Sequence, residues 1–176
     1  MVEKVNARTV FILPNNGNII MVAQQCAHLT EKEIIVIPSK TVPQGITAMM
    51  NADFECGDPQ EMAQAMTASL ATVSTAQITY AARDSDFDGF AIRQGDYLVL
   101  RDGKLFGTDP DENALLRALA ESAAQSDPSF LSLYYGEDVT EEQAAASAIF
   151  REACPGAELS VLSGGQPVYY YIISVE

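Results

Sequence analysis

The sequence has few basic residues, one histidine and no long apolar run, and each shortage excludes a class of protein. Ten lysines and arginines stand against 24 aspartates and glutamates, so the formal net charge is −14. A surface this acidic repels phosphate backbones and anionic lipids, so we expect no nucleic-acid partner and no anionic membrane. No apolar run reaches the ~18 residues of a membrane helix, and we expect no signal peptide. The charge is typical of a cytoplasmic protein.

The scarcity of cysteine and histidine excludes two further kinds of site. The three cysteines are widely spaced and form no C-x-x-C pair. This set predicts neither a protein-built zinc site nor a disulfide framework, and it fits a reducing compartment. The nucleotide-binding patterns GxxxxGK(S/T) and GxGxxG are absent, and no serine or cysteine stands in a recognisable catalytic motif. We therefore expect no metal, no cofactor and no catalytic residue in this chain.

What the chain does contain is a series of α/β patterns. Apolar runs at 10–13 and 34–37 flank an amphipathic stretch at 16–29. Continuous apolar runs are typical of strands in a parallel sheet, so this part predicts a parallel βαβ unit. The stretch between them carries an apolar stripe at helical spacing, which we expect to be buried. That stripe consists of Ile19, Val22, Ala23, Cys26 and Ala27.

The rest of the chain changes period twice. Short strand patterns over 77–100, followed by Asp-Gly at 102–103, predict an antiparallel β-meander. Strand and helix patterns over 130–162 predict a second βαβ unit. With 176 residues and no flexible linker, we expect a single domain over 1–176, with lobes at 1–84 and 85–176.

Polar bends are the places where a ligand or partner could bind. Two of them follow the first two apolar runs and lead into helices, whose amino termini suit a phosphate or a carboxylate. Because neighbouring parallel strands end at one edge of a sheet, we expect these two bends to lie together. The alternative is that their residues only cap helices and form turns. The candidate binding residues are Asn15, Asn16, Asn18, Ser39, Lys40, Thr41, Gln44, Gly164, Gly165 and Gln166.

Six short motifs then carry a resemblance that covers nearly the whole chain. They are ILPNN at 12–16, NII at 18–20, VIPSKTVPQG at 36–45, TYAARD at 79–84, YGED at 135–138 and GGQPVY at 164–169. In this order they resemble the carboxyl-terminal domain of FakA, the A subunit of the bacterial fatty acid kinase, from a dihydroxyacetone-kinase-like family. The resemblance implies an α/β fold of the DegV-like kind, with parallel βαβ units at both ends and an antiparallel β-meander inserted between them.

The resemblance also implies a function. In that family an amino-terminal domain binds ATP and magnesium and forms an acyl phosphate, so both cofactors are expected only in a kinase domain absent from this chain. The carboxyl-terminal domain is implicated in docking FakB, a DegV-type carrier of the fatty acid. Two alternatives stay open: a module that binds a fatty acid or phosphate itself, and a dihydroxyacetone-kinase-like enzyme. Self-association into a homodimer also stays open.

Overall fold

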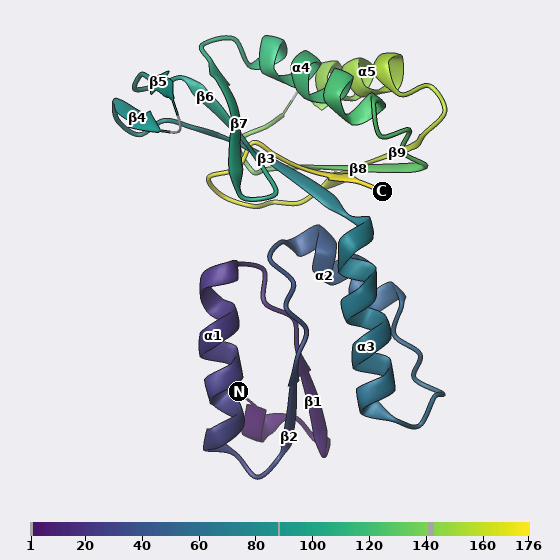
Figure 1. Ribbon diagram of the computed structural model, residues 1–176. Helices are drawn as coiled ribbons and strands as arrows, with labels where there is room; N and C mark the ends of the chain where they lie inside the picture. The colour runs from purple at the N-terminus through teal and green to yellow at the C-terminus, as the bar shows by residue number, and fades with distance from the viewer. Residues whose placement is uncertain (1, 88, 141–142) are drawn as a thin grey trace. The chain divides into compact units, whose positions relative to one another are not determined.

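The chain folds into two compact units, Met1–Val73 and Ser74–Glu176 (Figure 1). The computed structural model describes residues 2–87, 89–140 and 143–176, without the side chains of 143–145. The division falls earlier than the predicted one after residue 84. The reason is β3 (Ser74–Tyr80), which pairs with two strands of the second unit and therefore belongs to its sheet.

The first unit is built on a pair of parallel strands, β1 (Thr9–Ile12) and β2 (Glu33–Val36). A short 3-10 helix, Val2–Lys4, precedes them. Helix α1 (Gly17–Cys26) and the 3-10 turn η2 (Ala27–Leu29) connect the two strands, which completes the predicted βαβ unit. Both strands therefore end at the same edge, where the polar bends begin.

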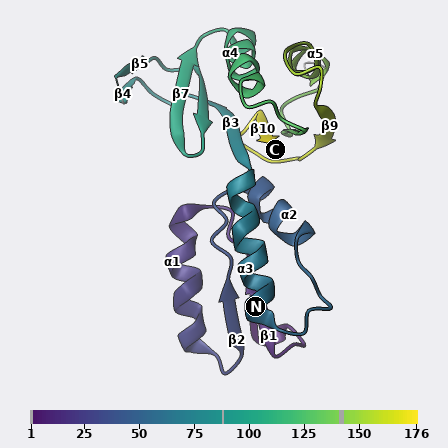
Figure 2. The same ribbon diagram turned by 45° about the vertical axis from the view of Figure 1, so that its right-hand side comes forward.

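Two further helices complete the first unit, α2 (Val42–Met50) and α3 (Pro59–Ser69), followed by the 3-10 turn η3 (Leu70–Thr72). Figures 1 and 2 show α1 on one side of the strand pair and α2 and α3 on the other. A small core joins β2 to α2 and α3. It contains Ile35, Ile37, Ala48, Ala63, Met66 and Leu70.

The predicted burial of the α1 stripe is wrong for its larger members. Ala23 is buried, but Ile19 is 46% exposed and Val22 is 59% exposed. Helix α1 packs against β2, and the small side chain of Ala23 is its buried residue. Periodicity identifies an apolar face correctly, but it does not show whether the chain supplies enough surface to cover that face.

The second unit contains a six-stranded mixed sheet in the order β7-β6-β3-β10-β8-β9. Neighbouring strands are antiparallel except β8 and β9, which are parallel. Its strands besides β3 are β6 (Tyr97–Arg101), β7 (Lys104–Asp109), β8 (Phe130–Tyr135), β9 (Glu158–Ser163) and β10 (Tyr171–Val175). The meander strands and the final strands thus share one sheet, because β3 pairs with β6 on one side and with β10 on the other.

Two helices, α4 (Glu112–Ala124) and α5 (Gln143–Ala153), lie side by side on one face of this sheet (Figure 1). Leu116 and Leu119 from α4, Phe150 from α5 and Ile173 from β10 are almost completely buried between the layers. A separate hairpin is formed by β4 (Ser85–Phe87) and β5 (Phe90–Ile92). Among the described residues, no helix combines the length and apolar character needed to cross a bilayer.

Candidate functional site

The bends that follow β1 and β2 lie together, as the sequence predicts. Ile12 and Val36 are register partners at the ends of the two strands. Just beyond, the amide of Ile37 donates to the carbonyl of Ile12 over 2.9 Å. The hydroxyl of Ser39 then donates to the carbonyl of Pro14, which ties the second bend directly to the first. The amino-terminal ends of α1 and α2 therefore begin at one edge of the first unit.

In the first bend, Asn16 is the amino-terminal cap of α1. Its side-chain oxygen accepts a hydrogen bond from the amide of Asn18 at 2.9 Å. This satisfies one of the amides that the first helical turn leaves unpaired. The side chains of Asn15, Asn16 and Asn18 are all exposed, so the bend keeps polar groups at the surface while it starts the helix.

In the second bend, the candidate residues form hydrogen bonds with one another and with their own unit. Ser39 has no exposed surface and Thr41 is 8% exposed. Thr41 caps α2, because its hydroxyl accepts from the amide of Gln44 at 3.4 Å. The Gln44 amide oxygen accepts from the amide of Lys40 at 2.8 Å, and its nitrogen donates to the carbonyl of Leu70 at 3.4 Å. These hydrogen bonds hold the bend within the first unit, and the bond to Leu70 ties it to η3.

Lys40 is the charged residue of this edge, and its side chain is exposed. It precedes the cap of α2, where helix amides carry a partial positive charge. Lys40 with Asn15 and Asn18 can therefore meet an anionic or polar group from outside. The arrangement forms a polar edge and not an enclosed pocket, because Ser39 and Thr41 point into the protein.

Gly164, Gly165 and Gln166 belong to the second unit, so the edge described above consists of first-unit residues alone. The amides of Gly164 and Gly165 donate to the carbonyl of Tyr135 at 2.9 and 3.3 Å. The side chain of Gln166 donates to the carbonyl of Tyr134 at 3.0 Å. Gly165 has φ 59, a left-handed conformation that glycine adopts without steric cost. This loop is thus attached to the carboxyl end of β8.

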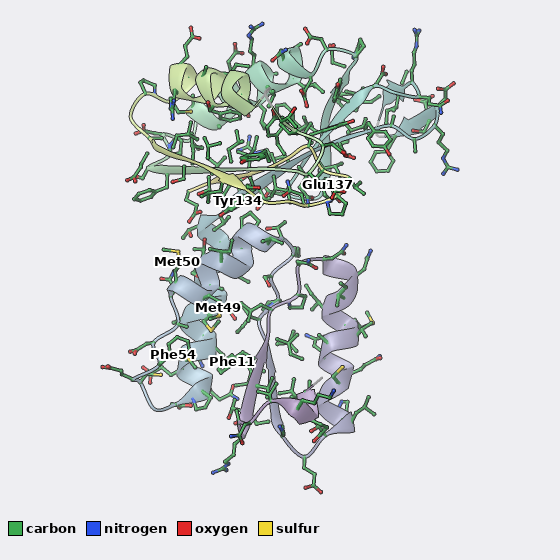
Figure 3. The ribbon with its side chains drawn as sticks, turned by 180° about the vertical axis from the view of Figure 1, so that it is seen from behind. Phe11, Met49, Met50, Phe54, Tyr134 and Glu137 are labelled. Atoms are coloured by element: carbon green, nitrogen blue, oxygen red, sulfur yellow. The ribbon has the colours of Figure 1, made fainter. Side chains whose placement is uncertain are left out.

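Sequence reasoning missed Gly136 as the residue that lets this loop approach β8. A Cβ atom at Gly136 would lie 2.2 Å from the carbonyl oxygen of Tyr169, closer than any real contact. The next residue, Glu137, donates its amide to the carbonyl of Gln166 at 3.2 Å and is exposed, and it is labelled with Tyr134 in Figure 3. The YGED motif is the available signal. The backbone at Tyr169 comes so close to its second position that only glycine fits there.

Clusters of metal-binding side chains are absent from the part of the chain that the structure describes. No group of three or more histidine, cysteine, aspartate or glutamate side chains there could hold a metal ion. Burial raises the pKa of the Cys154 thiol above its ordinary value, which favours the protonated form of that sulfur. Cys154 is packed in the core of the second unit.

The fold is that of the DegV proteins. A DegV family protein from Corynebacterium glutamicum matches with a TM-score of 0.69 and 16% identity, over 99% of this chain and 76% of that one. The Streptococcus pneumoniae fatty acid kinase (Fak) B3 protein loaded with linoleic acid matches with a TM-score of 0.68 and 14% identity, over 97% of this chain and 72% of that one. At such identities the likeness shows the fold alone.

The sequence comparisons then specify the family within that fold. The model of the FakA-like C-terminal family, named for the fatty acid kinase component FakA, matches residues 1–176. Protein YloV of Bacillus subtilis (strain 168) is 36% identical over an alignment of 180 positions, which covers 99% of this chain and 32% of that protein. An uncharacterised protein of Staphylococcus aureus (strain USA300) is 33% identical, over 100% of this chain and 32% of that protein. This chain therefore belongs to the FakA-like C-terminal family, and it spans about a third of the length of those relatives.

Proposed function

We propose that this chain is the non-catalytic carboxyl-terminal part of a fatty acid kinase and docks an acyl-carrying DegV-type partner of the FakB kind. The polar edge of the first unit carries the proposal. Ser39, Thr41 and Gln44 are engaged within the unit, while Lys40 is presented at the surface. An exposed edge on a rigid support suits recognition of another protein better than enclosure of a substrate.

The ten candidate residues then have two kinds of role. Asn15, Asn16, Asn18 and Lys40 are exposed and are the proposed contact residues of the edge. The others shape the bends and the loop that carries Gln166, and we assign them no contact with the partner. ATP and magnesium are proposed to bind in the kinase part of the longer protein, since this sequence carries neither of the two nucleotide-binding patterns.

Titration calorimetry with a purified acyl carrier tests this function. The probe is a linoleate-loaded DegV-type protein encoded in the same genome as this chain, and the same carrier stripped of fatty acid is the control. We expect a saturable complex in the micromolar range or tighter, typical of a transient partner. No heat of binding at several hundred micromolar carrier, confirmed by sedimentation, would reject the docking function.

The second candidate function is direct binding of a fatty acid or phosphate. It is favoured by the solved relatives that carry fatty acids, among them the linoleate-loaded Fak B3 protein. A hollow of about 780 Å³ in the first unit suits an acyl chain poorly, because charged residues line part of it. These include Glu3, Arg8, Glu31 and Lys32. Native mass spectrometry of the purified chain tests this alternative, because a co-purifying fatty acid would add its own mass.

A further inference from the structure

Helix α2 is apolar on both of its faces, although only one of them is buried. Its sequence, VPQGITAMM, contains no charged residue. Pro43, Thr47 and Ala48 are buried against the unit. The opposite side also carries apolar residues, at the helical spacing i, i+4, i+7 and i+8. These are Val42, 44% exposed; Ile46, 38%; Met49, 46%; and Met50, 81%.

The apolar surface continues beyond the end of the helix. Phe54 follows α2 and is 74% exposed. Figure 3 shows Met50, Met49 and Phe54 following one another down one side of the first unit. We call these five residues, Val42, Ile46, Met49, Met50 and Phe54, the α2 face. A helix that carries apolar residues on two opposite faces is normally covered on both, so the α2 face indicates a missing contact.

The charges beside the α2 face indicate what chemistry would cover it. Asp53, Glu55 and Asp58 lie between α2 and α3 in the chain and are all exposed. A second copy of the chain would bring a like surface against these carboxylates, and each copy carries a net charge of −14. Like charges facing each other oppose association, whereas lysines or arginines around an apolar patch would complement them. The acidic border therefore favours a different protein over self-association.

The size and composition of the α2 face favour a transient partner. Five partly exposed side chains offer on the order of a few hundred Å² of apolar surface, below what a permanent dimer buries. Two of the five are methionines, whose flexible thioether chains adapt to different contact surfaces. Both properties suit an acyl carrier that docks and leaves again.

We propose that the α2 face is the docking surface for the acyl-carrying DegV-type partner, which meets it with an apolar patch bordered by lysine or arginine on the side of Asp53, Glu55 and Asp58. This assignment rests on the proposed function and adds the location of the contact. Lys40 lies two residues before Val42, so the polar edge and the α2 face are continuous along the chain. The edge then supplies polar contacts beside an apolar centre, which is the usual anatomy of an interface.

Charge substitutions at position 50 test the location. Met50→Lys and Met50→Glu both remove the apolar contact, but only lysine places a positive charge against the partner's basic border. We expect Met50→Lys to weaken binding of the linoleate-loaded carrier about tenfold or more, and Met50→Glu to weaken it less. Met21→Lys is the matched control, because Met21 is a 69% exposed methionine on α1. It should change the affinity less than about twofold, and all three variants should melt like the wild type.

Each contrary result has a distinct meaning. Wild-type binding that Met50→Lys leaves unchanged, or that Met21→Lys weakens equally, would overturn the location but not the function. A wild type that binds no carrier would overturn both. A wild-type dimer that Met50→Lys dissociates in sedimentation equilibrium would assign the α2 face to a second copy. In the free chain, a crosslink from a photoreactive residue at position 50 to residues 74–176 would assign it to the chain itself. Either assignment would overturn the proposal.

Discussion

The two units differ in how much of their apolar surface they enclose. In the second unit, two helices cover one face of a six-stranded sheet, and Phe150, Leu133 and Ile173 have no exposed surface. In the first unit, helices flank only two strands, and large apolar side chains of α1 and α2 remain exposed. The second unit has the construction of a self-sufficient domain, whereas the first presents surface that suits binding.

The difference follows from sheet size. A parallel pair of strands offers a narrow surface, and parallel sheets usually need several strands with helices on both faces. Ala23 alone is buried from α1, so the larger residues of its apolar stripe find no strand to cover them. Stability therefore rests more heavily on the second unit, and recognition more heavily on the first.

The largest expected effect comes from truncating the core of the second unit. Phe150→Ala removes a ring with no exposed surface from between α5 and the sheet. We expect a loss of about 3–5 kcal/mol in the free energy of unfolding, because the cavity cannot collapse fully. Calorimetry and hydrogen exchange in α5 and β8 measure it. The same change at the exposed Phe54 of the first unit should cost less than about 0.5 kcal/mol; equal losses at both positions would contradict the contrast between the units.

A smaller loss is expected from the bend of the first unit. Ser39→Ala removes the buried hydroxyl that donates to the carbonyl of Pro14. We expect about 1–3 kcal/mol of destabilisation in urea unfolding, because that carbonyl loses a buried donor. Ser160→Ala, at an exposed position on β9, is the control and should be neutral. Unchanged stability together with weaker carrier binding would instead make Ser39 a contact residue.

Much of this architecture could be predicted from local patterns. The apolar runs at 10–13 and 34–37 are parallel neighbours joined by a helix, and residues 130–135 form β8. The Asp and Thr caps of the helices can also be predicted, as Thr41 before α2 and Asp58 before α3 show. These features depend on residues close in sequence, where periodicity and cap chemistry act directly.

Other features depend on contacts that local patterns do not encode. The sequence does not show that β3 pairs with β10, which lies at the far end of the chain. It therefore could not be predicted that the meander and the final strands share one sheet. It predicts the bends around Ser39 and Asn16 but not that the Ser39 hydroxyl points inward to Pro14. Nor does the i, i+4, i+7 spacing distinguish a covered face from the exposed Ile46 and Met49.

The pH dependence of stability sharpens the contrast further, because the second unit encloses Cys154. Burial raises the pKa of this thiol, so the folded chain holds the proton to higher pH than the unfolded chain. Its contribution to stability is full below the ordinary thiol pKa of about 8.5 and is lost as pH rises through the raised value. Above about pH 8.5, the wild type should lose more unfolding free energy with rising pH than Cys154→Ala. Parallel curves would show that the buried thiol does not matter.

The smallest effect on stability, and the most specific one on binding, is expected at Lys40. Its side chain is exposed, and Lys40→Ala keeps the backbone amide that donates to Gln44. The melting temperature should hardly change, while carrier binding weakens a few-fold and the loss fades at high salt, as for any exposed charge. Lys104→Ala removes an exposed lysine from β7 and should leave binding intact. A large fall in the melting temperature of Lys40→Ala would show that Lys40 stabilises the bend. If Lys104→Ala weakened carrier binding equally, Lys40 would act only through the net charge of the chain.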